Sequence, residues 1–350
     1  MKTRLSIVAL AALVALATSG AATPAGATER PVRITLATMA PEGSSWHTNL
    51  ERMGAEWRLA TGGAVQLRIF AGGSLGVESE VIRKMRLGQP DAAAISNDGL
   101  AGIERDAFAL NMPLVFESYE EWDYVRRQIN PTLEEKLAEK GFVVLAWSDI
   151  GWVHFFAKEP LSHPDELKSR RLAASATDVE EVEILKSLGF NPIPIPMVDT
   201  VTGLQTGMID SFYYPIIMAE ASQLYRHAKN MTSLQWAPLQ GAIVMQTRSW
   251  ERLESDHREA MARISREICA ELRESNRQHE QRSLEAMVAR GLNVVTIDAA
   301  TKSAWQRLAE ENYDQIRGRL VDEEIFDKVM ELRDEYRATV RASRQTATNF

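Results

Sequence analysis

One long segment without proline or glycine constrains the size and the domain organisation of the fold. It covers residues 256–290, which are 35 residues rich in good helix formers. At about 1.5 Å per residue, a helix of this length extends over roughly 50 Å. Its apolar residues do not keep a heptad pattern through the polar stretch 274–282, which argues against a coiled coil. We therefore predict a helix that spans two domains.

The composition is typical of a globular protein with a substantial apolar core. The chain has 350 residues, 45% of them hydrophobic and 25% charged, and this length fits two domains or one large domain. Acidic residues outnumber basic ones by 48 to 40, so nothing supports a nucleic-acid-binding face, which requires a basic surface. Cys269 is the single cysteine, which excludes an internal disulfide and argues against a structural zinc site.

The N-terminus has the pattern of an export signal. Lys2 and Arg4 precede an apolar stretch over residues 5–17, and the small residues of 25–27 follow. This order predicts a signal peptide over residues 1–27, cleaved after Ala27, and a periplasmic location. The alternative is an uncleaved anchor. No later stretch is apolar for about 18 residues, so we expect the mature chain to be soluble.

Strand-like and helix-like segments alternate along the mature chain. Alternating or β-branched runs predict strands, and apolar residues at helical spacing predict helices. The first unit has expected strands over 32–38, 65–70 and 91–96, with helices from Ser44 or Ser45 to Ala60 and over 78–87. The second unit, about 151–236, has expected strands over 153–157, 172–174, 191–196 and 208–212, with helices over 165–167, 179–188 and 200–207. A further strand is expected over 142–147 and another over 294–297, with helices over about 301–340. This alternation predicts an α/β fold with a parallel or mixed sheet covered on both faces.

The motifs of the common enzyme classes are missing from the sequence. There is no G-x-S-x-G, no H-E-x-x-H, no Walker loop and no strand-linked G-x-G-x-x-G. The six histidines are scattered, and Cys269 lies among apolar residues of the long predicted helix. We therefore expect no enzyme activity, no catalytic residue, no cofactor and no metal.

Aromatic residues stand near the ends of several predicted strands. In open α/β sheets, ligands bind at the carboxyl ends of strands, where aromatic rings can hold a small solute. The residues concerned are Trp147, Trp152, Tyr213, Tyr214 and Trp236. The alternative is that these rings pack between the two domains. For Tyr213 and Tyr214 we favour a binding site, because they end a strand and precede Pro215.

Five motifs stand out along the chain in a specific order and spacing. They are E-L-K-S-R-R-L over 166–172, L-K-S-L-G-F-N-P over 185–192, L-Q-T-G-M-I-D over 204–210, G-S-L-G over 73–76 and N-M-P-L-V-F over 111–116. Together they resemble the DctP-type solute-binding proteins of tripartite ATP-independent periplasmic (TRAP) transporters, although no single motif decides, and the resemblance covers about residues 32–333. It implies a periplasmic-binding-protein-like fold with two α/β domains, a long helix spanning both, and closure on a solute.

The resemblance implies the following division of the chain and the following partners. The expected parts are a signal peptide over 1–27, α/β domain I over 28–150 plus about 237–279, α/β domain II over 151–236 plus about 280–340, and a flexible tail over 341–350. The implied partners are a small organic solute and the membrane subunits of a TRAP permease, with a monomeric receptor. Two rival hypotheses are a receptor that feeds a sensor kinase and a secreted enzyme on the same bilobal fold.

The sequence departs from the family pattern where typical members bind a carboxylate. The resemblance places Ala173 and Val153 at the two positions where the family has arginine, and Tyr213 and Tyr214 at a Glu-Asn pair. A buried carboxylate needs a paired cation or several donors. We therefore expect a solute that is less anionic than a C4-dicarboxylate and contacts more aromatic rings. Arg171, on the same strand face as Ala173, is a possible substitute cation.

Two arguments select the candidate solute-binding residues. Matching family positions give Met39, Ser96, Asn97, Val153, Ala173, Met197 and Tyr214. The position of strand ends alone adds Glu42, Asp98, Trp152, Tyr213 and Trp236.

The predicted signal peptide leads to a direct test. N-terminal sequencing of the protein from a periplasmic fraction should begin at or near Thr28, because the small residues before it suit signal peptidase. Recovery of a chain that keeps Met1 in a membrane fraction would contradict the prediction.

Overall fold

A computed structural model describes residues 30–176 and 178–348. The chain from Pro31 onward forms one compact unit. The predicted signal peptide over 1–27 lies outside the described residues. Within the described part of the chain, no helix is both long enough and apolar enough to cross a bilayer.

Three parallel strands and two helices build the first part of the sheet. Their pairing order is β2-β1-β3. Ile34 and Leu36 of β1 are fully buried. The side chain of Ser44 caps α1 by accepting a hydrogen bond from the backbone N–H of His47. The predicted bounds are confirmed to within a residue at each end. The elements are β1 (Val32–Thr38), α1 (Ser45–Ala60), β2 (Val65–Phe70), α2 (Glu78–Leu87) and β3 (Ala92–Ile95).

A single strand, β4 (Phe142–Ala157), runs through both parts of the sheet. Its first part pairs antiparallel with β9 (Pro238–Gln246), and its last part pairs antiparallel with β7 (Ser211–Pro215). The sheet order is β2-β1-β3-β9-β4-β7-β5-β6. The sequence predicted two strands, over 142–147 and 153–157. They are continuous because Gly151 adopts a φ of 128°, which lets the strand pass through an irregular register.

The second part of the sheet contains shorter elements. The sequence predicted a strand over 208–212, whereas β7 begins only at Ser211. The strand begins later because Gly207 ends α7 in the left-handed region and the chain turns before Ser211. The elements of this part are α5 (Pro164–Lys168), β5 (Arg171–Ser175), α6 (Val179–Ser187), β6 (Asn191–Ile195), η2 (Met197–Asp199), α7 (Thr200–Thr206), α8 (Ile216–Ala221), η3 (Leu224–Arg226) and β8 (Asn230–Thr232).

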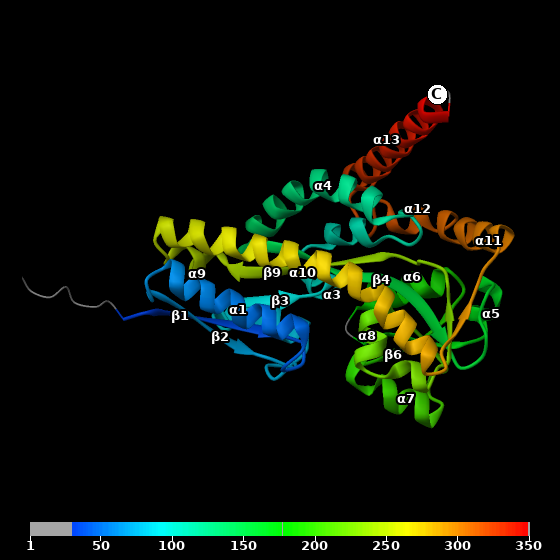
Figure 1. Ribbon diagram of the computed structural model, residues 1–350, viewed down its shortest axis with the longest axis horizontal. Helices are drawn as coiled ribbons and strands as arrows, with labels where there is room; N and C mark the ends of the chain where they lie inside the picture. Colours follow the sequence, from blue (N-terminus) through cyan, green and yellow to red (C-terminus); the bar gives the residue numbers. More distant parts are fainter. Residues whose placement is uncertain (1–29, 177, 349–350) are drawn as a thin grey trace, which may run out of the picture. The chain divides into compact units, whose positions relative to one another are not determined.

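The long predicted helix is α10 (Ser255–Ala289), with 35 residues. It packs against α1 beside the first part of the sheet, against β4, and against α8 beside the second part (Figure 1). Its buried residues, among them Met261, Ile268 and Met287, follow one face of the helix. The prediction of a helix that contacts both parts of the sheet is therefore confirmed.

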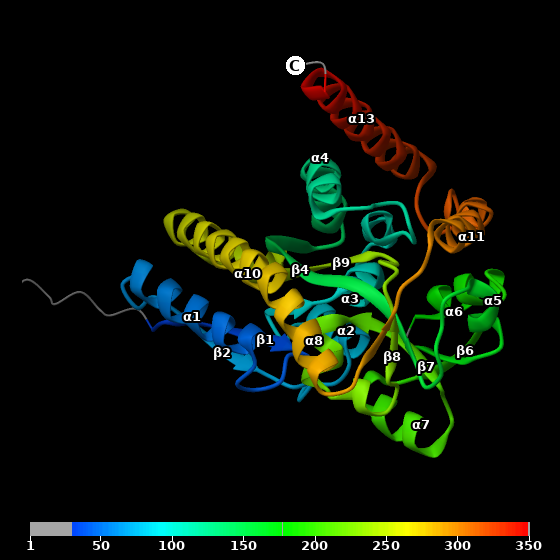
Figure 2. The same cartoon turned by 45° about the vertical axis from the view of Figure 1, so that its right-hand side comes forward.

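The remaining elements include α4, which packs against β4, and the helices at the C-terminus. α13 packs against α4, and its C-terminal end projects away from the sheet in both views (Figures 1 and 2). It continues to Thr348, into the segment 341–350 where the sequence analysis expected a tail. The elements are α3 (Asn97–Ile103), η1 (Arg105–Asn111), α4 (Tyr119–Glu139), α9 (Thr247–Glu251), β10 (Asn293–Val295), α11 (Ala299–Glu310), α12 (Tyr313–Ile316) and α13 (Glu323–Thr348).

A buried carboxylate joins β4 to both neighbouring helices. Asp149 of β4 is 1% exposed and accepts hydrogen bonds from Arg126 of α4 and, at 2.7 Å, from Arg277 of α10. Arg277 also binds Asp123 of α4 at 2.8 Å, and the Asn276 amide donates to the Asp149 backbone carbonyl at 3.2 Å. Because the charges neutralise one another, the ions can stay buried and hold the two helices on the strand.

Removal of this carboxylate should destabilise the fold strongly. We expect Asp149→Ala to lower the free energy of unfolding by about 3–5 kcal/mol, because it leaves the Arg126 and Arg277 guanidinium groups with Asp123 alone to balance their charge. The exposed pair of Glu183 and Lys186 provides the control, and Glu183→Ala should cost less than about 1 kcal/mol. Urea unfolding at neutral pH measures both. Equal losses in the two variants would contradict the structural role of Asp149.

Candidate functional site

A cleft lies between helices that flank the two parts of the sheet. It has a volume of about 650 Å³, part of which is open to solvent. Four carboxylates line it: Glu78 at the start of α2 and Asp98 in α3 on one side, and Asp178 and Glu181 at the start of α6 on the other. Its other lining residues are Ser79, Ala101, Gly102, Arg105, Phe108, Ile184 and Leu320.

Glu78 is fixed by the N-terminus of α3. Its carboxylate accepts the backbone N–H of Ser96 at 2.9 Å, the Ser96 hydroxyl at 2.6 Å and the backbone N–H of Gly99 at 2.9 Å. A Cβ at Gly99 would lie 2.7 Å from the Glu78 carboxylate and 2.7 Å from Ile95 Cβ, so only glycine allows this approach. Burial raises the pKa of Glu78, and the hydrogen bonds from Ser96 and Gly99 oppose that shift.

Asp98 carries the most strongly perturbed carboxyl group of the cleft. Burial raises its pKa well above the usual range, and the nearby charges of Glu181, Glu78 and Asp178 raise it further. The Asn97 amide donates to it at 2.9 Å. The neighbouring carboxylates therefore favour the protonated form of Asp98.

Glu181 lies at the centre of the opposite side. The hydroxyl of Tyr213 donates to one of its oxygens, and the backbone N–H of Ser175, at the end of β5, donates to the other at 2.9 Å. Burial raises the pKa of Glu181 to about 7, although the bond from Tyr213 lowers it. Asp178 caps α6 by accepting the Glu181 backbone N–H at 2.9 Å, which keeps both carboxylates at the same helix end.

The next residue along β7, Tyr214, is not among the residues that line the cleft. Its hydroxyl lies 3.2 Å from the hydroxyl of Thr200, a fully buried residue at the start of α7. Burial raises the pKa of Tyr214 to about 12, and the charges of Glu181 and Asp98 contribute. Both tyrosines are therefore neutral at physiological pH and can donate hydrogen bonds.

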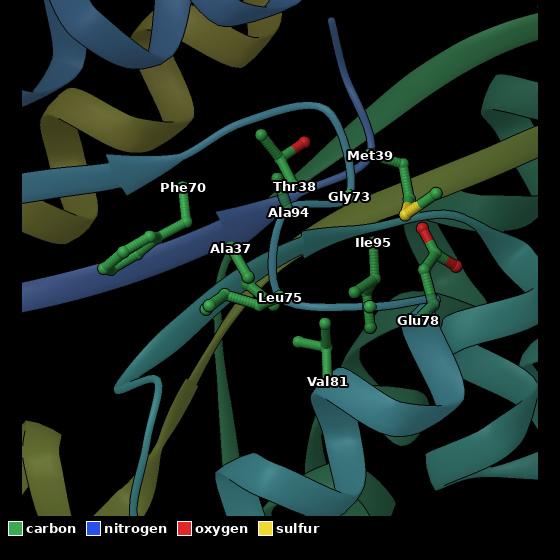
Figure 3. Close-up of a pocket in the computed structure, with 12 residues that line it drawn as sticks. Ala37, Thr38, Met39, Phe70, Gly73, Leu75, Glu78, Val81, Ala94 and Ile95 are labelled. Carbon is green, nitrogen blue, oxygen red and sulfur yellow. The ribbon is translucent and has the colours of Figure 1, made fainter.

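A smaller hollow, with about 10 Å³ open to the centre of a water-sized sphere, adjoins Glu78 at the carboxyl ends of β1 and β3. Figure 3 shows Met39 and Glu78 on the same side of it, with Phe70 and Leu75 among its apolar walls. The sulfur of Met39 lies against the glycine-rich turn, 3.2 Å from where a Cβ on Gly73 would be. Met39 is thus placed next to the cleft without lining its acidic part.

The structure brings together five of the twelve candidate residues around Glu78 and Glu181. These five are Ser96, Asn97, Asp98, Tyr213 and Tyr214, of which Asp98 lines the cleft and the other four line neither cavity. Four others are buried among apolar side chains and line neither cavity: Trp152, Val153, Ala173 and Trp236, which are 0%, 2%, 4% and 4% exposed. Glu42 and Met197 are exposed and likewise line neither cavity.

The sequence analysis missed three of the four carboxylates, Glu78, Asp178 and Glu181. The pattern Asp178-x-x-Glu181 resembles a helix-capping sequence, and Glu78 opens a helix after a glycine-rich turn. These signals indicate where helices begin and not where a ligand binds. The substitute cation considered above, Arg171, pairs with Asp210 at 3.0 Å at the opposite end of β5 from Ser175.

The described residues contain no group of three or more His, Cys, Asp or Glu arranged to hold a metal ion. The site is therefore one of hydrogen-bonding carboxyl and phenol groups around an open cleft, suited to holding a small polar molecule.

Comparison with known proteins identifies the family. The sequence matches the model of the bacterial extracellular solute-binding protein family 7 (DctP) over residues 36–319. The chain belongs to this family. It is therefore a solute-binding protein of the TRAP type and not an enzyme, as the motifs predicted.

Curated relatives and solved structures agree with this assignment. The C4-dicarboxylate-binding periplasmic protein DctP of Rhodobacter capsulatus is 24% identical over 269 residues, which are 76% of this chain and 80% of the relative. The ectoine-binding periplasmic protein TeaA of Halomonas elongata is 30% identical over 122 residues, 35% of this chain and 34% of the relative. A TRAP periplasmic solute-binding protein of Xanthobacter autotrophicus, solved with β-D-galacturonate, matches with a TM-score of 0.79 at 22% identity and covers 86% of this chain and 99% of its own. The predicted fold class is thereby confirmed.

The raised pKa of Glu181 should be visible as a pH dependence of stability. Its carboxyl group stays protonated in the folded protein up to about pH 7, whereas in the unfolded chain it ionises from about pH 4.5. The folded state therefore binds more protons in this window, and the free energy of unfolding should fall as pH rises from 4.5 to 7. Glu181→Gln should remove about 1 kcal/mol or more of this decline.

Urea unfolding at several pH values between 4.5 and 7.5 measures the effect. The matched control is Glu183→Gln on the same helix, where the side chain is exposed, and it should keep the full decline of the unmodified protein. A decline that is equally steep in Glu181→Gln would show that burial does not perturb this carboxyl group.

Proposed function

We propose that the chain is the periplasmic receptor of a TRAP transporter and captures a small organic solute in the acidic cleft. The observation that carries the proposal is the position of this cleft. Its walls come from α2 and α3 beside the first part of the sheet and from α6 beside the second part. A solute bound there touches both parts at once, so binding favours their approach.

The proposed domains follow from the same position. Domain I comprises residues 28–150 and about 237–279, and domain II comprises 151–236 and about 280–340. The hinge would lie where β4 passes Gly151, where the chain approaches β9 near Trp236, and in α10. A Cβ on Gly151 would stand 3.4 Å from Pro215 and 3.7 Å from Glu280, and the φ of 128° already favours glycine there.

The proposed contacts to the solute are hydrogen bonds and aromatic surfaces. Asp98 and Glu181 supply polar groups at the cleft, Asn97 and Tyr213 donate hydrogen bonds to these two carboxyl groups, Tyr214 follows Tyr213 in β7, and Phe108 supplies an apolar wall. Simple C4-dicarboxylates fit poorly, because a dianion would face several carboxylates with little positive charge to balance them. The solute would then be an organic acid derivative or a less anionic compound.

The proposed cellular context follows the family. The receptor is exported with cleavage after Ala27, remains a monomer in the periplasm and delivers the solute to the membrane subunits of a permease. The family match and the periplasmic names of the relatives support this context.

Closure on the solute can be measured by small-angle scattering. The solute released from purified protein by denaturation is first identified by mass spectrometry and then returned to protein refolded without it. The radius of gyration should fall on saturation, because binding selects the closed arrangement. A value that does not change although calorimetry shows full occupancy would rule out closure as the mechanism.

A further inference from the structure

We infer that the solute carries a positively charged nitrogen, held between Asp98 on one side of the cleft and Glu181 on the other. This inference rests on the proposed function, because it concerns the chemistry of the solute that the same cleft would take. It concerns the charge of that solute and adds no second site.

The charges that line the cleft are strongly unequal. Among its described lining residues are four carboxylates and one guanidinium, that of Arg105, and there is no lysine. The carboxylates come from three separate helices, α2, α3 and α6, so they are not neighbours on one exposed helix face. Such a lining attracts cations and repels anions, and the walls of low polarity strengthen both effects.

The described hydrogen bonds leave acceptor capacity on the two central carboxylates. An ionised carboxylate offers about four acceptor positions. The bonds described for Glu181 come from the Tyr213 hydroxyl and the Ser175 backbone, and those for Asp98 from the Asn97 amide and the Ser175 hydroxyl. All of these donors are neutral. An ammonium group would add donors and a positive charge beside these two carboxylates.

Other features of the cleft fit a cation. Phe108 lines the cleft, Tyr213 lies beside it through its hydrogen bond to Glu181, and the face of an aromatic ring attracts an ammonium group. Burial raises the pKa of Glu181 to about 7, so a bound cation would displace a proton from this carboxyl group. Binding of a cation should therefore weaken as the pH falls below about 7.

The first experiment tests the charge of the solute directly. Solute-free protein, prepared by unfolding and refolding, is incubated with the small molecules of yeast extract, washed, and denatured for mass spectrometry. We expect the captured molecule to contain a basic nitrogen. Capture of an anion or a neutral polyol without such a nitrogen would overturn the inference and leave the proposed receptor function standing. Capture of nothing would refute the receptor function itself.

The second experiment assigns the charge to the named residues. Calorimetric titration of the captured molecule should show at least a tenfold loss of affinity in Asp98→Asn and in Glu181→Gln, each of which keeps the shape of the side chain. Glu183→Gln, an exposed position on the same helix, should stay within twofold of the unmodified protein. Thermal unfolding verifies that each variant is folded.

The same titrations contain two further controls. In Glu181→Gln, affinity should change less between pH 5.5 and pH 7.5 than in the unmodified protein, because the glutamine side chain carries no titratable proton for the cation to displace. Succinate should not bind with micromolar affinity. Unchanged affinity in both carboxyl variants, or micromolar binding of succinate, would overturn the inference.

Discussion

The burial of Asp149 at the middle of β4 is the constraint on which the rest of the structure depends. An unpaired ion at this depth would be very costly, so the strand requires Arg126 from α4 and Arg277 from α10 beside it. The long helix and the strand are thereby held together close to Gly151, where β4 passes from one part of the sheet to the other.

The charges of the cleft contrast with those of the Asp149 cluster. Around Asp149 each carboxylate meets a guanidinium, and the group of ions is nearly closed to solvent. Around Asp98 and Glu181 the described donors are neutral, and the space between the carboxylates is open. Two groups of carboxylates in one chain thus have different consequences: the one paired with arginines stabilises the fold, and the one at the cleft leaves charge for a bound molecule to balance.

Local patterns in the sequence predicted most of the fold. The strand alternation of β1 and β2 and the capping serine of α1 determine local structure by themselves, so their bounds agree closely with the predictions. The sequence predicted only some of the residues at the cleft. Asp98 follows a strand closely and the tyrosine pair lies in one, whereas Glu78 and Glu181 look like ordinary first-turn helix residues until the chain brings their helices together. Trp152 and Trp236 also lie at the expected positions, but their rings enter the apolar core.

The strand order affects how early the chain can fold during synthesis. β3, which closes the first part of the sheet, pairs with β9, and α1 packs against α10, so this part needs residues up to about the end of α10. A growing chain that has produced β1, β2 and β3 still lacks the neighbours that cover them. The N-terminal part therefore cannot complete its core while the ribosome is still making the first two thirds of the protein. A chain with this strand order stays unfolded for longer, and an unfolded chain is the form that an unfolded-chain translocation machinery would accept.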